Sequence, residues 1–221
     1  GDGEPATQAL LNQPEGMAVG ADGSVLIADA RNHRIRRVAP GGIITTVVGG
    51  GDGTGPANGF GGDGGPAFDA LLDTPTDVAF RADGSYVIAD SGNHRIRRVA
   101  PNGVITTIAG IGLGLAGDGG PAVAARLNTP RELAPMPDGA LLVADSGNHR
   151  IRRVAADGII TTIAGGSPGF AGDGGPAVAA QLNDPRGVTP TADGGYLIAD
   201  AGNSRIRKVD AAGIIATVGG S

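Results

Sequence analysis

Residues 76–110 read "TDVAFRADGSYVIADSGNHRIRRVAPNGVITTIAG" and carry the clearest indication of the fold. It contains four short apolar segments, rich in β-branched residues and separated by turn residues, and each has the length of a strand. Asp-Gly in the first connector is a strong hairpin signal, because both residues tolerate the positive φ of a tight turn. The segments at 76–80, 85–90, 95–100 and 104–110 therefore predict a four-stranded antiparallel meander.

The same pattern occurs four times along the chain. The asparagine of "NHRIRRV" stands at positions 32, 93 and 148 and, as "NSRIRKV", at 203, so the spacings are 61, 55 and 55 residues. Meanders repeated at this interval are typical of a β-propeller with one meander per blade. We expect one all-β propeller domain over 1–221 with four four-stranded antiparallel blades. The blades fall at about 1–50, 61–110, 117–165 and 172–220, with an insertion at about 51–60 and short helical turns in the connectors, where proline precedes alanines.

Two segments resemble an NHL repeat, "LNTPRELAPMPDGALLVADSGNHRIRRVAADGIITTIAG" (127–165) and its counterpart at 182–220. The marks are proline before strand one, Asp-Gly in the first hairpin, "AD-x-x-N-x-R-I-R" around the second and "IITT" on strand four. The "GDGGPA" spacer resembles the long-spacer form of bacterial NHL proteins and teneurin-like ones. Relatives of this kind usually close with six blades. The four blades here allow a closed ring, which we favour because it leaves no bare blade face, part of a larger propeller, or two chains paired into eight blades.

Composition limits the classes of function. The net charge of −5 disfavours nucleic-acid binding, and the absence of cysteine excludes thiolate chemistry. No apolar run approaches the roughly 18 residues of a spanning helix, and residues 1–30 lack the pattern of a signal peptide. We expect no membrane span and an extracellular or cell-envelope location, and the richness in Gly, Ala and Arg is typical of GC-rich bacterial coding.

Each repeat ends its second strand with an aspartate, five residues before the first arginine of strand three. Across the short turn these side chains face one another, which predicts structural ion pairs. A basic belt for RNA is the alternative, and some NHL domains bind RNA. The repetition, the negative charge and the scarcity of aromatic residues favour the ion pairs. The predicted pairs are Asp29–Arg34, Asp90–Arg95, Asp145–Arg150 and Asp200–Arg205.

The histidines occupy one turn position in three repeats, and serine replaces them in the fourth. Equivalent atoms of adjacent blades should lie more than about 10 Å apart, too far for the ~2 Å bonds of a zinc site. The "GDGGPA" loop lacks the Lys-Ser/Thr of a phosphate loop, and its one carboxylate is few for calcium. We therefore predict no metal, no cofactor and no catalytic residue, with calcium or zinc as the alternative that stays open, and interpret the loop as the joint between blades.

The polar positions that differ most between repeats follow the proline before strand one. Strand one is innermost in a propeller, so these residues should line one mouth of the axial channel. We predict a non-enzymatic scaffold that binds a protein or a small polar ligand there. A metal-assisted propeller lyase or hydrolase is the alternative function, and a homodimer forming a larger ring is the alternative assembly. The predicted binding residues are Glu15, Asp77, Arg131, Glu132 and Arg186.

Overall fold

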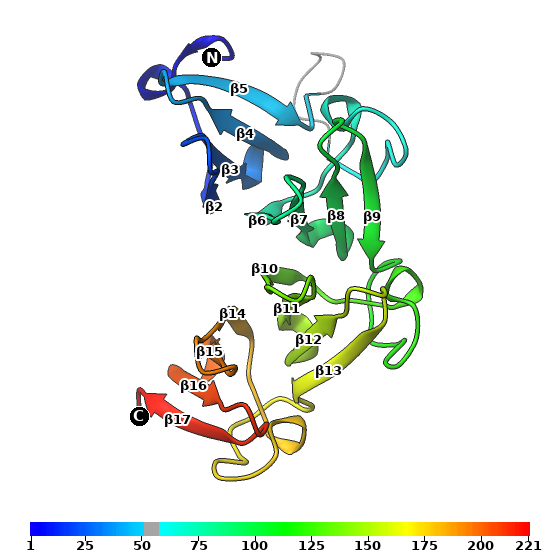
Figure 1. Ribbon diagram of the computed structural model, residues 1–221, viewed down its shortest axis with the longest axis vertical. Helices are drawn as coiled ribbons and strands as arrows, with labels where there is room; N and C mark the ends of the chain where they lie inside the picture. Colours follow the sequence, from blue (N-terminus) through cyan, green and yellow to red (C-terminus); the bar gives the residue numbers. More distant parts are fainter. Residues whose placement is uncertain (51–57) are drawn as a thin grey trace. The chain divides into compact units, whose positions relative to one another are not determined.

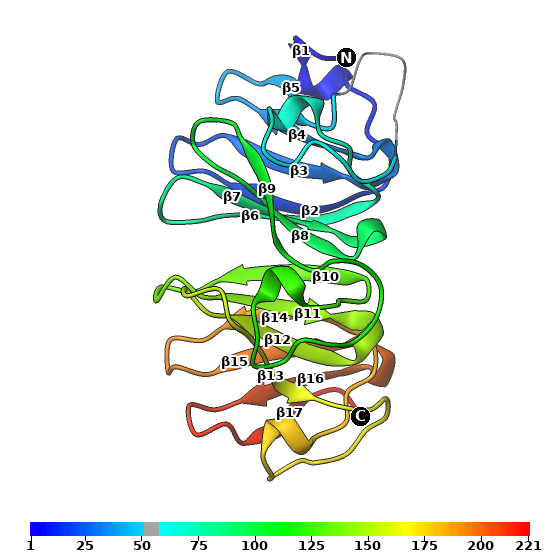
Figure 2. The same ribbon diagram turned by 90° about the vertical axis from the view of Figure 1, so that its right-hand side faces the viewer.

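The apolar segments of all four repeats form antiparallel strands in the computed structural model, which describes residues 1–50 and 58–221. Most of the predicted insertion at 51–60 falls on residues 51–57, which lie outside the described residues. The chain divides into two units, Gly1–Ile108 and Ala109–Ser221, with the boundary at the end of β9. Figures 1 and 2 show two sheets in each unit.

In unit 1, the first sheet has the strand order β1-β5-β4-β3-β2 and the second the order β6-β7-β8-β9. Each meander therefore follows the sequence order, as the hairpin signals predicted. The short β1 adds a fifth strand to the outer edge of the first sheet by pairing with β5. The strands are β1 (Glu4–Pro5), β2 (Pro14–Val19), β3 (Val25–Asp29), β4 (Arg34–Val38), β5 (Ile43–Val48), β6 (Pro75–Phe80), β7 (Tyr86–Asp90), β8 (Arg95–Val99) and β9 (Ile105–Ala109).

Unit 2 repeats this arrangement with two four-stranded sheets, in the orders β10-β11-β12-β13 and β14-β15-β16-β17. In each unit the first strands of the two sheets are neighbours, β2 beside β6 and β10 beside β14 (Figure 1). The strands are β10 (Pro130–Pro135), β11 (Leu141–Asp145), β12 (Arg150–Val154), β13 (Ile160–Gly165), β14 (Pro185–Pro190), β15 (Tyr196–Asp200), β16 (Arg205–Val209) and β17 (Ile215–Gly219).

Each repeat contains two kinds of short 3-10 helix. One kind follows the proline of each "GDGGPA"-type spacer, and the other lies between the second and third strands of each sheet. All are single turns of three residues, as expected where a proline presets φ or a hairpin needs four connecting residues. They are η1 (Ala6–Gln8), η2 (Ala30–Asn32), η3 (Ala67–Asp69), η4 (Ser91–Asn93), η5 (Ala122–Ala124), η6 (Ser146–Asn148), η7 (Ala177–Ala179) and η8 (Ala201–Asn203).

The core of each unit lies between the facing sides of its two sheets. In unit 1, Leu26, Ile35 and Val48 of the first sheet meet Leu72 and Val78 of the second repeat. Small residues such as alanine recur among the buried positions and let the sheets approach closely. Full burial of one leucine contributes about 1.5–3 kcal/mol relative to exposure. The corresponding positions of the third and fourth repeats form the core of unit 2.

Candidate functional site

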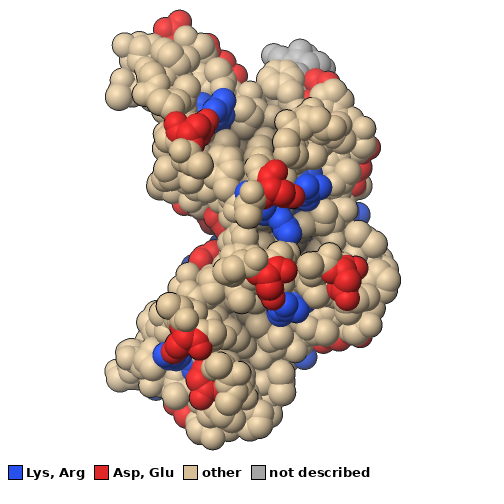
Figure 3. Space-filling view, in the orientation of Figure 1, with Lys and Arg blue, Asp and Glu red and all other residues tan. Residues whose placement is uncertain are grey.

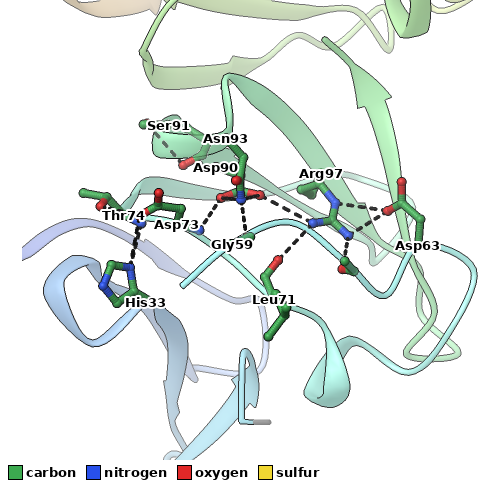
Figure 4. Close-up of polar contacts among 12 residues, drawn as sticks. His33, Gly59, Asp63, Leu71, Asp73, Thr74, Asp90, Ser91, Asn93 and Arg97 are labelled. Carbon is green, nitrogen blue, oxygen red and sulfur yellow. Dashed lines mark hydrogen bonds and ion pairs between the residues drawn. The ribbon is translucent and has the colours of Figure 1, made fainter. Parts of the chain in front are cut away.

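The aspartate that ends each second strand is buried and bonded from several sides. Asp90 is fully buried, accepts a hydrogen bond from the Asp73 N–H at 2.8 Å, and accepts another from the Asn93 side-chain amide (Figure 4). Arg97 Nη1 lies 3.4 Å from its second carboxylate oxygen. Burial raises the pKa of Asp90 to about 6, against the lowering effect of these bonds. The other repeats carry equivalent ion pairs, Arg36–Asp29, Arg152–Asp145 and Arg207–Asp200.

These contacts correct the predicted ion-pair partners. The strand register does place Asp29 opposite Arg34 and Asp90 opposite Arg95, as expected. The salt bridge, however, reaches the arginine two residues further along strand three. This diagonal neighbour shares the face of the strand and lies within reach of a long side chain. The facing arginines Arg34, Arg150 and Arg205 donate instead to the asparagine carbonyl of the turn, and Arg95 stacks 3.9 Å above the Phe60 ring.

The spacer loop supplies a second carboxylate to the same buried arginine. Asp63 accepts from Arg97 Nη2 at 2.7 Å, and the carbonyls of Leu71 and Gly61 accept from the same guanidinium (Figure 4). Gly62, at φ 84°, gives the loop its left-handed turn. The "GDGGPA" loop is therefore part of the packing of the sheet that follows it. The equivalent spacer pairs are Arg36–Asp2, Arg152–Asp118 and Arg207–Asp173.

The last basic residue of each strand three pairs with the aspartate of the first hairpin. Arg98 contacts Asp83 at 2.8 Å, and both side chains are at least one-third exposed. Figure 3 shows blue and red side chains adjacent on one face, rather than a patch of a single sign. The equivalent pairs are Arg37–Asp22, Arg153–Asp138 and Lys208–Asp193. Each of these basic side chains is thus held in an ion pair, and the choice between a structural role and a basic belt stays a prediction.

The repeated histidine position has a backbone role. His33 and His149 adopt the left-handed conformation at the end of a 3-10 turn, with φ of 53° and 55°. The His33 Nδ1 atom accepts a hydrogen bond from the Thr74 N–H at 3.0 Å, and His149 Nδ1 accepts from the Asp184 N–H at 3.1 Å. Each histidine therefore joins its own repeat to the next one. Among residues 1–50 and 58–221, no group of three His, Asp or Glu side chains is arranged to hold a metal.

The predicted binding residues lie at β-bulges. The proline that begins each first strand pairs with the aspartate that ends the second, and the register then shifts. Bulges re-aim side chains and are common near binding sites. In unit 1 the bulges place Glu15 and Asp77 on the neighbouring strands β2 and β6, with the Asp77 side chain packed over Gly16. Glu15 is exposed and Asp77 is half-buried.

In unit 2 the corresponding residues form a second group. Glu132 packs over Gly187 and accepts a hydrogen bond from the Val188 N–H, while burial raises its pKa. Arg131 is half-buried on the same strand, and the exposed Arg186 pairs with Asp184 at 2.7 Å. The structure thus gathers the five residues into two groups, one per unit. A single site made from all five stays a prediction.

One groove in unit 1, made of two adjoining hollows, was not expected from the sequence. The larger hollow, of about 670 Å³, is lined by Phe80, Tyr86, Leu26 and Gly20, among others. A second hollow of about 460 Å³ adjoins it and is lined by Phe68 and again Tyr86. One feature of the sequence could have indicated this groove: three of the aromatic residues lie in repeat 2, more than in any other repeat.

Four-stranded antiparallel blades, tied by one Asp–Arg system in every repeat, define a β-propeller protein of the NHL class. An NHL repeat model matches residues 72–99. The model of the teneurin NHL domain matches residues 1–57 and 166–221, which together make up just over half of the chain. The chain belongs to the teneurin NHL domain family, as the resemblance of its repeats predicted.

Curated relatives include human teneurin-4, which is 33% identical over 238 residues, and mouse teneurin-1, which is 30% identical over 232 residues. The match covers 95% of this chain and 8% of each relative, so the chain spans a small part of their length. These relatives are animal proteins and give no support to the expected bacterial origin.

Solved structures share the fold. A streptogramin B lyase aligns over 95% of this chain and 55% of its own, with a TM-score of 0.63 and 14% identity. An auxiliary nutrient binding protein from Bacteroides ovatus ATCC 8483 aligns over 95% and 49%, with a TM-score of 0.68 and 19% identity. At these identities the likeness concerns the fold alone, and it confirms the predicted β-propeller class.

Proposed function

We propose that this chain is a non-enzymatic interaction module that binds a protein or a small polar ligand. One observation carries the proposal: the repeated His, Asp and Arg residues bond to the framework in one repeat after another. The Nδ1 atom of His33, for example, accepts from a backbone N–H and is thereby occupied as an acceptor. Recognition then falls to the side chains that differ between repeats, because these can specify one partner.

Membership of the teneurin NHL family supports this function, and an extracellular location is proposed with it. Among the described residues, none of the helices has the length and apolar character that crossing a membrane requires. A metal-assisted lyase or hydrolase needs a cluster of ligands or a placed acid–base pair, and no contact described above favours one. Titration with zinc in a calorimeter tests that alternative, and tight stoichiometric binding would support it against ours.

The proposal is tested with the biotinylated chain, made tetravalent on streptavidin and applied to cells that each display one secreted or cell-surface protein. We expect saturable binding to at least one partner, with competition by the unlabelled chain. Glu132→Lys or Arg186→Glu should weaken it. The control is Asp157→Lys, which changes the charge by the same amount as Glu132→Lys but at an exposed turn residue. This substitution should leave binding unchanged. Binding to no partner, or binding that never saturates, would contradict the proposal.

The assembly of the chain is a separate prediction. A single chain has a mass of 21.6 kDa, and a pair of chains has twice that mass. Sedimentation equilibrium over a range of concentrations distinguishes them. A mass of two chains supports the paired ring, and a mass of one chain at all concentrations excludes it.

A further inference from the structure

The groove in unit 1 is the open edge of the interface between its two sheets. Its two hollows, of about 670 and 460 Å³, share Val47, Tyr86, Val99 and Gly103. Val99 belongs to the buried core cluster of the unit, and Val47 and Tyr86 pack against that cluster. The groove is therefore continuous with an apolar interface that the chain already builds.

Aromatic residues are concentrated at this groove. The chain has four phenylalanines, two tyrosines and no tryptophan. Three of these six aromatic residues, Phe68, Phe80 and Tyr86, line the two hollows. Phe80 and Tyr86 meet edge to face with ring centroids 6.1 Å apart, and Phe68 is 46% exposed. Partly exposed aromatic residues around a concave apolar surface are typical of binding sites.

Unit 2 shows what fits the equivalent place. Met136, at the position that Gly20 occupies in unit 1, packs against the core of unit 2, as Tyr196 also does. The two hairpins have the same turn bonds, from Gly23 N–H to the Gly20 carbonyl and from Gly139 N–H to the Met136 carbonyl. A Cβ on Gly20 would lie 2.7 Å from Asp22 Oδ1 and 3.1 Å from Phe80 Cζ, and both residues line the groove. A side chain there would therefore enter the groove once the Asp22 side chain moves aside. The unit 1 groove therefore lacks the thioether side chain that Met136 supplies at the equivalent place in unit 2.

The tyrosine at this place differs in the same way. Tyr196 Oη donates a hydrogen bond to the Ile163 carbonyl at 3.0 Å. Tyr86 is the equivalent residue in unit 1, and within the described part of the chain its hydroxyl makes no hydrogen bond. A bound partner that offers an acceptor to this half-buried hydroxyl would gain a hydrogen bond, and that bond would stabilise the complex.

We infer that the unit 1 groove binds a segment of a partner protein that inserts an aliphatic side chain of methionine size and offers a backbone carbonyl to Tyr86 Oη. This inference rests on the proposed interaction function. Three charged residues line the groove: Asp22 and Arg37 form an ion pair, and Arg81 is engaged in an interaction of its own. A neutral peptide segment therefore suits the groove better than an anionic molecule.

The test uses the capped tripeptide acetyl-Ala-Met-Ala-amide as probe and acetyl-Ala-Gln-Ala-amide as its polar isostere. Binding to the full chain is followed by amide chemical shifts and by tyrosine fluorescence in Tyr196→Phe, where Tyr86 is the remaining tyrosine. We expect shifts at residues 20–26, 80–86 and 99–104, and about tenfold tighter binding of the Met probe. Equal binding of both probes, or shifts elsewhere only, would overturn the inference.

Substitutions sharpen the test. Gly20→Met, Ala21→Pro and Ser24→Ala together convert the unit 1 hairpin into residues 136–140, which already fold in this chain. We expect this variant to lose probe binding, and Tyr86→Phe to bind about fivefold more weakly, the usual effect of one neutral hydrogen bond.

Two equivalent exposed residues give a matched control for these variants. Phe68→Ser should weaken probe binding, whereas Val178→Ser, at the same position of repeat 4, should leave it unchanged. Unchanged binding by the converted hairpin would refute the site.

The two proposals fail in different ways. If the converted hairpin loses the probe but keeps full binding to the cellular partner, the groove does not recognise that partner and the interaction function stands. If the probe binds the groove but no displayed protein binds the chain, the proposed interaction function fails while the groove remains a peptide site.

Discussion

Arg97→Met, which breaks the buried ion pair, should lower the free energy of unfolding by an amount that depends on pH. Arg97 is fully buried and bonds to Asp63 at 2.7 Å and to Asp90 at 3.4 Å. Methionine has a similar length but no charge, so Asp90 would keep its burial and lose its cation. Removing one partner of a buried pair costs about 3–5 kcal/mol. We expect a loss of this size in the free energy of unfolding at pH 7.5.

The sign of the pH dependence follows from the pKa of Asp90, which burial raises to about 6. In the parent protein the protonated carboxyl favours the folded state at low pH, and this contribution is lost as the pH rises from about 4 to about 6. Without Arg97 the pKa of Asp90 rises further, so the loss continues above pH 6. At about 1.4 kcal/mol per pH unit, the defect should be about 2 kcal/mol larger at pH 7.5 than at pH 5.5.

Urea denaturation followed by circular dichroism at both pH values measures this difference. Arg98→Met is the matched control, because its partner Asp83 is half-exposed and such surface pairs contribute about 0–1 kcal/mol. A defect of Arg97→Met that is equal at the two pH values, or no larger than that of Arg98→Met, would refute the reasoning.

Three further predictions each compare two substitutions, made at equivalent positions of two repeats, at one position, or within one loop. Leu72→Ala, in the core, should cost about 2–5 kcal/mol of unfolding free energy, whereas Leu11→Ala, at the same position of repeat 1 but 36% exposed, should cost under about 1 kcal/mol in thermal or urea unfolding. His33→Ala removes the acceptor of a backbone N–H and should cost about 1–3 kcal/mol, and His33→Asn, which tolerates the left-handed backbone, should restore only part of it; full restoration by Asn would contradict the hydrogen-bond role. Gly62→Ala should lower the melting temperature more than Gly64→Ala, because both have positive φ but only Gly62 faces a backbone atom, at 2.7 Å, and the reverse order would show that this close approach is relieved easily.

The meanders could be predicted because their signals are local. The Asp-Gly turns, such as Asp83 with Gly84 at φ 78°, form where the sequence places them, and Asp83 accepts from the Ser85 N–H at 3.0 Å. β7 and β8 lie within one residue of the predicted segments. The strand register also follows, since a four-residue turn sets which residues face each other.

The ion-pair partners and the groove could not be predicted in the same way. Asp90 had two arginines on one strand face, and the choice of Arg97 depends on the Asp63 carboxylate, which the spacer loop brings from 34 residues earlier. The groove depends on what is absent at Gly20 and present at Phe80, two positions in different repeats. Contacts between residues that are far apart in the chain produce no periodic pattern in a single sequence, so they could not be predicted from it.

The spacer loop has a consequence for how such a protein can change its number of blades. Each buried guanidinium receives a carboxylate that lies 34 residues earlier, in the loop that opens its own repeat. A gene duplication whose ends fall just before this loop inserts a blade that already carries its own counterion. A duplication cut after the loop would leave a cation buried without that partner, so selection should favour recombination points on the N-terminal side of the aspartate.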